Sequence, residues 1–329
     1  MFGLESEVIA TGTPYMRIQF IGQAAMAFRF LCEGIMQASG DSVTPMKQAL
    51  FYRIFHIALC PFLVFGWWIF PSMGVSGAAI TSVVSQALGT MLGLRILFTG
   101  RSRVQLSFKN FHLDMKVIWR MVKIGIPALV SGIQRSLGHI FLMWFMVPFG
   151  TMAVAAHSIN QRIDMMLVMP AMAFGTASGV LTGQNLGRLQ PERAEKSAWK
   201  AVILVQVIMS IISVGILLGA ESVTGLFATE PSLVELSSSF LRINVVSLMC
   251  MALMFVLMSS LTGAGDTVPP MIISLTTAWA VMLPLAYLLP KYTGLGMYGV
   301  RWAIVSQMVA GALIFTIYFR TGRWKRKQI

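Results

Sequence analysis

Two acidic residues of this chain stand apart because they fall inside long apolar runs. Of the 12 Asp and Glu residues among 329, only Glu33 and Asp164 lie away from the polar segments and the ends of the runs. An ionisable group at membrane depth is expensive to keep there and usually has a function. Both residues are therefore candidates for binding a cation, a proton or a substrate, and a structural buried pair is the alternative for Asp164.

Basic residues and one histidine accompany these acids. Arg29 precedes Glu33 by four residues, so the two side chains share a helix face and can pair. Arg162 is two positions before Asp164, a spacing that does not bring them face to face, so we expect the partner of Asp164 on another helix. His56 could relay protons near neutral pH, although a hydrogen-bonded packing role is the simpler expectation.

No sequence pattern indicates an enzyme. The chain contains no HExxH, GxSxG or P-loop sequence and no acid pair at a plausible catalytic spacing. Cys32, Cys60 and Cys250 lie within apolar runs without CxxC spacing, so we expect them to pack as small apolar residues. We predict no catalytic residues, no metal site and no cofactor.

The elements that must position these residues are membrane helices. The composition is 56% hydrophobic and 11% charged, with a mean hydropathy of +0.75, whereas soluble domains are about a quarter charged. A span requires about 20 apolar residues. The sequence predicts an all-α membrane protein with about nine spans. They cover residues 15–38, 46–70, 75–99, 118–148, 153–187, 194–219, 235–263, 268–289 and 297–320.

The charged residues indicate how the spans are oriented. The net charge is +13, but the basic residues gather in alternate short loops, which argues for a cytoplasmic membrane face and against nucleic acid. These residues are Lys47, Arg101, Arg103, Lys109, Lys116, Arg120, Lys123, Arg188, Arg193, Lys196, Lys200, Arg320, Arg323, Lys325, Arg326 and Lys327. The opposite loops carry mainly acids. We therefore predict a multi-pass protein of the plasma (inner) membrane with a cytoplasmic C-terminus.

A repeat relates the first three predicted helices to the last three. Residues 37–46 match residues 262–271, and Asp41 and Asp266 are 225 positions apart, as are Arg17 and Arg242. The shared turn positions are Gly40, Asp41 and Pro45 in the first copy and Gly265, Asp266 and Pro270 in the second. In each copy the acid can cap the following helix, and proline suits its first turn.

The repeat also predicts the architecture of a complete molecule. The copies are six helices apart, so both cross the membrane in the same direction, which is a parallel repeat. The helices between them have no counterpart upstream. We therefore expect three further helices before residue 1, and 12 helices in two six-helix lobes.

Several motifs together resemble the multidrug and toxic compound extrusion (MATE) family. The segment with Ala155-Ala156-His157, Arg162-Ile163-Asp164 and Pro170 is similar to the second helix of a lobe in that family. Further resemblance lies in the duplicated turn and at Gln184, Asn185 and Gly187, at Gly125-Ile126-Pro127, and at Trp279 with Pro284. The resemblance covers nearly the whole chain, as helices four to twelve of the family.

The resemblance implies two lobes, alternating access, and export of organic cations or other amphiphiles in exchange for H⁺ or Na⁺. This chain departs from the family at acids associated with coupling. Cys60 stands where many members have an aspartate, and Gln134-Arg135 and the neighbourhood of Met251 lack the acids of Na⁺-type members. These departures favour protons or a different cation site.

The resemblance also suggests how the chain is divided. We expect part of an N-terminal lobe at 1–99, a cytoplasmic linker at 100–116, a six-helix lobe at 117–320 and a basic tail at 321–329. The expected partners are small cationic or amphiphilic organic compounds and membrane lipids, and we expect a monomer. A flippase for lipid-linked substrates, favoured by arginines inside spans, and a non-transporting remnant are the alternatives.

Overall fold

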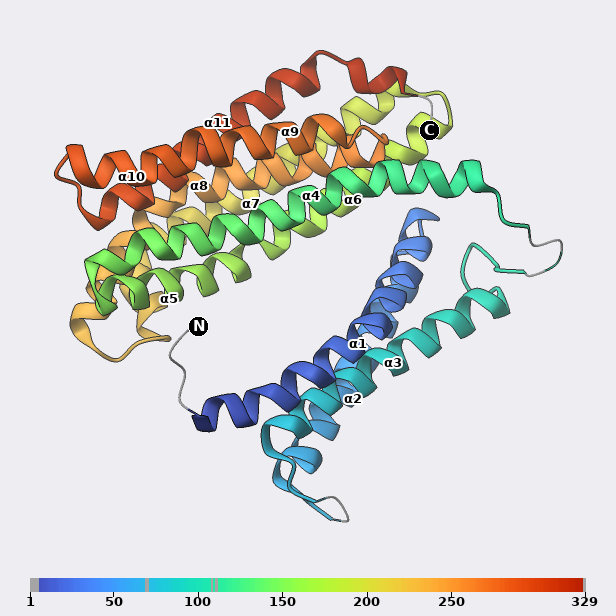
Figure 1. Cartoon of the computed structure of the whole chain (residues 1–329). Coiled ribbons are helices and arrows are strands. Elements are labelled where there is room, and N and C mark those ends of the chain that lie inside the picture. The colour runs from blue at the N-terminus through green and yellow to red at the C-terminus, as the bar shows by residue number, and fades with distance from the viewer. Residues whose placement is uncertain (1–5, 69–70, 108, 110–111, 328–329) are drawn as a thin grey trace. The chain divides into compact units, whose positions relative to one another are not determined.

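Long apolar runs bounded by glycine and proline turns fold here as long helices. The computed structural model describes residues 6–68, 71–107, 109 and 112–327, and within this part of the chain every regular element is a helix (Figure 1). The chain divides into two units, Met1–His112 and Leu113–Ile329, which we describe separately.

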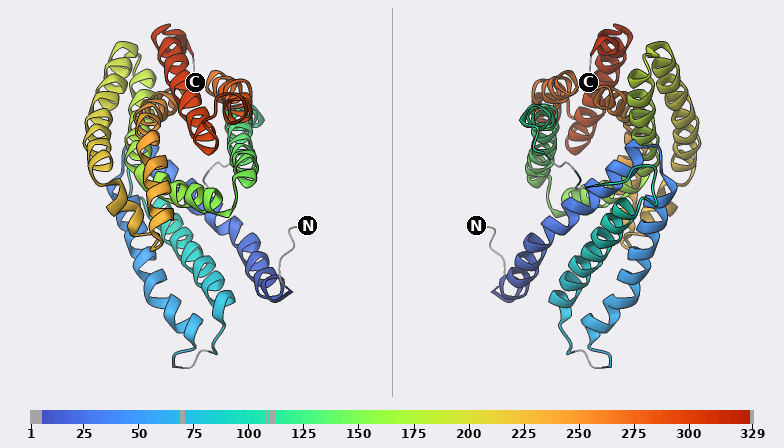
Figure 2. Two further views of the ribbon diagram at one scale, coloured as in Figure 1. Left: turned by 90° about the vertical axis from the view of Figure 1, so that its left-hand side faces the viewer. Right: turned by 90° about the vertical axis from the view of Figure 1, so that its right-hand side faces the viewer.

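The first unit is a bundle of three helices in which α3 packs against both others. The helices are α1 (Ser6–Ala38), α2 (Val43–Phe65) and α3 (Gly74–Thr99). Figure 2 shows α2 and α3 running side by side. The turn after α2 passes through Gly66, whose φ of 73° is in the left-handed region that glycine adopts without steric cost.

The second unit is built around α8, which packs against α5, α6, α7 and α11. Its elements are α4 (Met115–Met146), η1 (Val147–Phe149), α5 (Thr151–Leu167), α6 (Met169–Gly187), α7 (Pro191–Gly225), α8 (Pro231–Gly263), α9 (Val268–Thr276), η2 (Thr277–Met282), α10 (Leu283–Tyr292), α11 (Met297–Arg320) and η3 (Arg323–Arg326). Its largest apolar cluster includes Val205, Leu257 and Phe315, all fully buried.

Helical structure covers most of each predicted span, with two interruptions that the prediction lacked. The predicted span 46–70 is too long, because α2 ends at Phe65, and its residues 69–70 lie outside the described part. The predicted helix 153–187 is divided at Val168, two residues before Pro170, which has no N–H to donate to the preceding turn. The predicted helix 268–289 contains a short π-helix, η2. Among the described residues, eight helical segments are long and apolar enough to cross a membrane. Helix α1 is also long, but its charged and amide side chains lower its hydropathy.

Helices α6 and α8 cross at very short range because glycines line the contact. Gly175, Gly179 and Gly183 recur every four residues and form one face of α6. A Cβ atom added at Gly263 of α8 would lie 2.1 Å from the carbonyl oxygen of Gly179. The Ser178 and Ser260 hydroxyl groups are hydrogen-bonded across the same crossing, at 2.8 Å. Small residues at regular spacing are the usual basis of close helix packing in membranes.

The duplicated acidic turn has similar backbone geometry in both copies but different side-chain contacts. Gly40 and Gly265 have φ of 86° and 72°. The Asp41 carboxylate accepts the backbone N–H of Thr44 at 3.0 Å, as a helix cap would, and the hydroxyl of Ser102 at 2.9 Å. The hydrogen bonds with Thr44 lower the pKa of the Asp41 carboxyl below its ordinary value.

The predicted cap at Asp266 is wrong. Its carboxylate instead accepts the Tyr318 hydroxyl at 2.6 Å and pairs with Lys327. Lys327 follows Asp266 by 61 residues, the same separation as between Asp41 and Ser102. In both copies the acid therefore binds the segment that follows the third helix. In the first copy, Asp41 in addition caps the helix that follows it.

The last described residues pack against the second unit. The Trp324 side chain is fully buried, stacks on Phe319 at 4.7 Å and donates its indole N–H to the Phe319 carbonyl. Lys325 pairs with Glu195 of α7 at 2.5 Å. These contacts anchor the basic segment through Lys327, and residues 328–329 lie outside the described part.

Candidate functional site

Asp164 is held by a residue of another helix. Its Oδ1 accepts a hydrogen bond from Nδ2 of Asn244 at 2.6 Å, which joins α5 to α8 inside the second unit. This agrees with the expectation that its partner lies on a different helix. The adjacent candidate, Arg162, is exposed on α5 and points away from this contact, because two positions along a helix do not share a face.

Arg301 of α11 is a buried cation whose charge acts on Asp164. Its side chain is 2% exposed, and its charge interacts with the Asp164 carboxylate. The guanidinium lies over the Phe240 ring at 4.8 Å. Its Nε and Nη2 atoms have no hydrogen-bond partner among the residues that the structure describes. Together these two nitrogens form the edge that binds a carboxylate through two parallel hydrogen bonds.

Several buried polar atoms in the same region lack a hydrogen-bond partner among the described residues. His157, Asn160 and Asp164 follow at helical spacing along α5, and Asn160 donates to the Ser237 carbonyl of α8 at 3.0 Å. Within the described part of the chain, both ring nitrogens of His157, Oδ1 of Asn160 and Oγ of Ser237 are buried without a hydrogen-bond partner. Buried polar atoms normally have partners, so this cluster has free capacity to bind water or a ligand.

Sequence reasoning missed Arg301. It lies five residues into the span 297–320, where a basic side chain ordinarily reaches the membrane surface. The repeat contains the missing signal. Gly74-Val75-Ser76-Gly77 matches Gly296-Met297-Tyr298-Gly299, which places Arg301 opposite Ala79 of the first copy. A cation that replaces a small apolar residue at an equivalent depth is unusual and marks a site.

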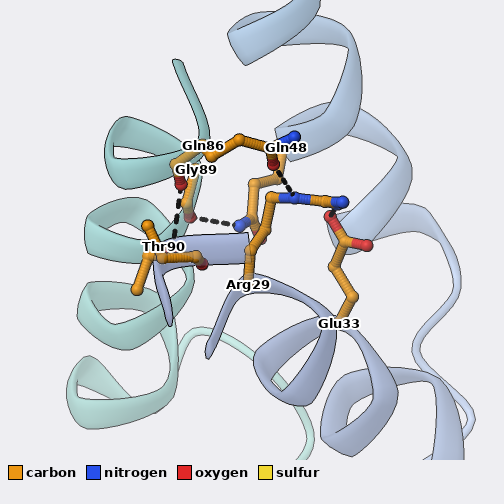
Figure 3. A network of polar contacts seen from close by, with 7 residues as sticks. Arg29, Glu33, Gln48, Gln86, Gly89 and Thr90 are labelled. Carbon is orange, nitrogen blue, oxygen red and sulfur yellow. Dashed lines mark hydrogen bonds and ion pairs between the residues drawn. The ribbon is translucent and has the colours of Figure 1, made fainter. Parts of the chain in front are cut away.

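The first unit holds a second polar network, shown in Figure 3. Arg29 pairs with Glu33 at 2.5 Å, as their spacing predicts, and donates from Nε to Oε1 of Gln86 on α3 at 2.5 Å. The guanidinium also faces the rings of Phe30 at 4.2 Å and Tyr52 at 5.0 Å. Arg29 is only 4% exposed, so this charge is stabilised by all three helices of the unit.

Two further contacts surround this network. On α2, Gln48 donates to the Gly89 carbonyl at 2.5 Å, and on α3, Thr90 donates to the Ala25 carbonyl at 2.7 Å. A small open pocket of about 60 Å³ lies beside it, between α1 and α3. The pocket is lined by Gln19, Gly22, Gln23, Met26, Ser82, Val83 and Gln86. His56, the remaining candidate, is partly exposed on α2, and the contacts of Arg29 do not include it.

The remaining motif residues take part in hydrogen bonds with the backbone or lie at the ends of helices. The carbonyl of Pro127, inside α4, accepts the Ser131 hydroxyl at 2.8 Å, and Asn185 donates to the Leu181 carbonyl at 2.8 Å. Gln184 and Gly187 lie in the last turn of α6, and Pro284 opens α10 after η2. In the part of the chain that the structure describes, no three His, Cys, Asp or Glu side chains come together as a metal site.

Known proteins match this chain along most of its length. The family model described as MatE matches residues 1–62 and 127–288, more than half of the chain. A probable multidrug resistance protein, YoeA of Bacillus subtilis, is 26% identical over 334 residues, which is 100% of this chain and 72% of that protein. A probable multidrug resistance protein, NorM of Thermotoga maritima, is 25% identical and covered to 70% of its length, against 99% of this chain.

Solved structures of other proteins share the fold of this chain. The outward-facing conformation of a multidrug resistance MATE family transporter superposes with a TM-score of 0.92 at 23% identity, over 99% of this chain and 73% of that one. A MATE protein in a bent conformation gives a TM-score of 0.89. These structures confirm the predicted all-α membrane fold. With the family match, they show that the chain belongs to the MATE family of membrane transporters and is not an enzyme.

Proposed function

We propose that this transporter is a secondary active antiporter that exports organic cations or other amphiphiles in exchange for protons. One observation carries the proposal. Asp164 lies inside a span, held by Asn244, and acts electrostatically with Arg301, whose carboxylate-binding edge has no hydrogen-bond partner among the described residues. The printed names of relatives in Bacillus subtilis and Thermotoga maritima, multidrug resistance proteins, support the class of substrate.

The two partners give Asp164 two stable arrangements. A protonated Asp164 is neutral and keeps its hydrogen bond from Asn244. An ionised Asp164 is stabilised instead by pairing with Nε and Nη2 of Arg301, since a buried carboxylate needs a counter-charge. The partners are on α8 and α11, so gain or loss of the proton changes how α5 is held against them. This is a bistable element of the kind that coupled transport requires.

The groups around Asp164 favour a proton over Na⁺. A proton needs only one carboxylate oxygen, whereas Na⁺ in transporters is coordinated by several oxygen atoms. Asn244 presents a nitrogen to the carboxylate, and Arg301 is a second nitrogen donor with a positive charge. Its charge repels a metal cation in the low-dielectric interior.

The experiment compares the two ion gradients directly. The chain, and the same chain with any coding sequence that precedes it in frame, is reconstituted in vesicles loaded with ethidium, a fluorescent organic cation. We expect a pH gradient, acidic outside, to drive ethidium efflux, and a Na⁺ gradient at equal pH to have no effect. Efflux driven by Na⁺ alone would contradict the proposed coupling ion.

We also propose an arrangement of lobes and faces. Residues 1–99 belong to an N-terminal lobe, 100–116 to a cytoplasmic linker, 117–320 to a C-terminal lobe and 321–329 to a cytoplasmic tail. Support comes from the basic loops and from the equivalent contacts of Asp41 and Asp266 with the segments after α3 and α11. The protein then lies in the plasma membrane and works as a monomer.

Cysteine labelling tests this orientation. We expect Arg103→Cys to resist an impermeant maleimide in intact cells and to react once the membrane is opened. Glu230→Cys, in the loop before α8, is the matched control and should react in intact cells. Both are made after replacing Cys32, Cys60 and Cys250. Rapid labelling at position 103 with protection at position 230 would reverse the topology.

A flippase for lipid-linked anionic substrates is the second candidate. It is favoured by the buried guanidinium groups of Arg29 and Arg301, which suit phosphate and carboxylate groups. A relative in Shewanella oneidensis, 23% identical over 83% of this chain, bears the name FAD transporter. Translocation of a fluorescent anionic lipid without ethidium efflux would favour this second function.

A further inference from the structure

The two copies of the repeat make the same close helix crossing with different residues. In the first unit a Cβ atom added at Gly89 of α3 would lie 2.9 Å from Cδ of Arg29 on α1. In the second unit a Cβ atom added at Gly311 of α11 would lie 2.6 Å from Cε of Met254 on α8. Met254 follows Arg29 by 225 positions, the offset that relates Asp41 to Asp266. Arg29 and Met254 therefore occupy equivalent places.

Among the described residues of the second copy, no ion pair lies at this crossing. The equivalents of Arg29 and Glu33 are Met254 and Met258, and both methionines pack against the main apolar cluster of the second unit. A close crossing at the equivalent positions thus forms with two apolar side chains. Replacing a buried ion pair by apolar residues is often neutral or stabilising. Helix packing therefore does not account for Arg29 and Glu33.

The surroundings of Arg29 leave Glu33 free to change its charge. Arg29 has a second set of partners, Oε1 of Gln86 and the rings of Phe30 and Tyr52, which remain if the bond to Glu33 is broken. A hydrogen bond and cation–π contacts offset part of the cost of a buried guanidinium. The Glu33 side chain is 13% exposed, so it is less enclosed than that of Arg29, which is 4% exposed.

The other groups facing this pair come from all three helices. Among the described residues, α1 contributes the Cys32 thiol next to Glu33, α2 contributes Tyr52 and the neutral amide of Gln48, and α3 contributes the neutral amide of Gln86. Arg29 is the cation in contact with the Glu33 carboxylate. Protonation of Glu33 is therefore opposed mainly by one ion pair.

We propose that Glu33 is a second proton-carrying carboxylate of this transporter and that Arg29 is its positioning residue. A proton binds a Glu33 oxygen, the bond from Nη1 of Arg29 breaks, and Arg29 stays on Gln86 and the two rings. Release of the proton restores the ion pair. This rests on the proposed antiport function. It adds one proton site in the first unit to that of Asp164 in the second, which gives two protons per exported cation.

The test replaces Arg29 and Glu33 by methionine, the residue found at both equivalent positions of the second copy. Arg29→Met with Glu33→Met is compared with the wild type, with Glu33→Gln, and with a control, Met254→Leu with Met258→Leu. Reconstituted vesicles are brought to equilibrium between a pH gradient and an ethidium gradient, with the membrane potential held at zero by K⁺ and valinomycin. The slope of the logarithmic ethidium ratio against the pH difference gives the number of protons.

We expect a slope of two for the wild type and the control, and one for both Glu33 variants, with the melting temperature of the double Met variant equal or higher. A slope of two in both Glu33 variants, or of one in the wild type, would overturn the second proton site while leaving antiport intact. A double Met variant that fails to fold, with Glu33→Gln unchanged in slope, would assign the pair to packing. Absence of any proton coupling in the wild type would remove both proposals.

Discussion

Replacing Asp164 by asparagine is expected to abolish proton-driven efflux while the protein still folds and inserts. Asparagine has nearly the same shape and can keep a hydrogen bond to Asn244, but it cannot carry a proton or pair with Arg301. The initial rate of ethidium efflux under a pH gradient should fall by more than about tenfold, which corresponds to about 1.4 kcal/mol in the barrier.

A matched control shows whether removing any other acidic side chain lowers the efflux rate in the same way. Glu235→Gln lies on α8, the helix that carries Asn244, but its side chain is exposed. We expect its efflux rate to stay near that of the wild type. If Asp164→Asn and Glu235→Gln transport equally well, Asp164 is a structural buried residue and the coupling site is elsewhere.

Replacing Gly263 by valine is expected to destabilise the second unit strongly. The added Cβ would lie 2.1 Å from the Gly179 carbonyl oxygen and 2.7 Å from its carbon, so α6 and α8 would have to separate. Overpacking of a tight core costs typically 1–3 kcal/mol and occasionally more, and backbone atoms cannot rotate away. We expect a loss of about 3 kcal/mol or more, seen as a lower melting temperature in detergent.

Gly215→Val provides the comparison for this variant. Gly215 is also inside a membrane helix, α7, but no atom of another described helix lies within 4 Å of the Cβ position there. It should leave the melting temperature within a few degrees of the wild type. Equal melting temperatures for both variants would show that the α6–α8 crossing is looser than the described geometry.

The sequence predicts most of the fold because the signals are local. Apolar runs of span length indicate the helices, and the duplicated turns around Asp41 and Asp266 indicate the repeat. The break at Val168 was not predicted, although Pro170 two residues later is its cause. The cap at Asp266 was predicted wrongly because its partners, Tyr318 and Lys327, are distant in the chain.

The candidate sites could be predicted from the sequence only where their contacts are between residues close in the chain. The pair of Arg29 and Glu33 depends on a spacing of four residues within one helix, so the sequence shows it. The partner of Asp164 depends on which helices meet, and Asn244 carries no local sign of that contact. Arg301 was missed because a cation near a span end looks interfacial, and only its comparison with Ala79 in the repeat reveals it.

The most direct test of proton exchange is to observe the protons during substrate movement. Vesicles containing the protein, ethidium and a pH-sensitive dye are diluted into ethidium-free buffer at equal pH. If protons are exchanged through Asp164, ethidium efflux acidifies the vesicle interior and Asp164→Asn removes this acidification. Ethidium efflux by the wild type without any change in internal pH would contradict proton antiport.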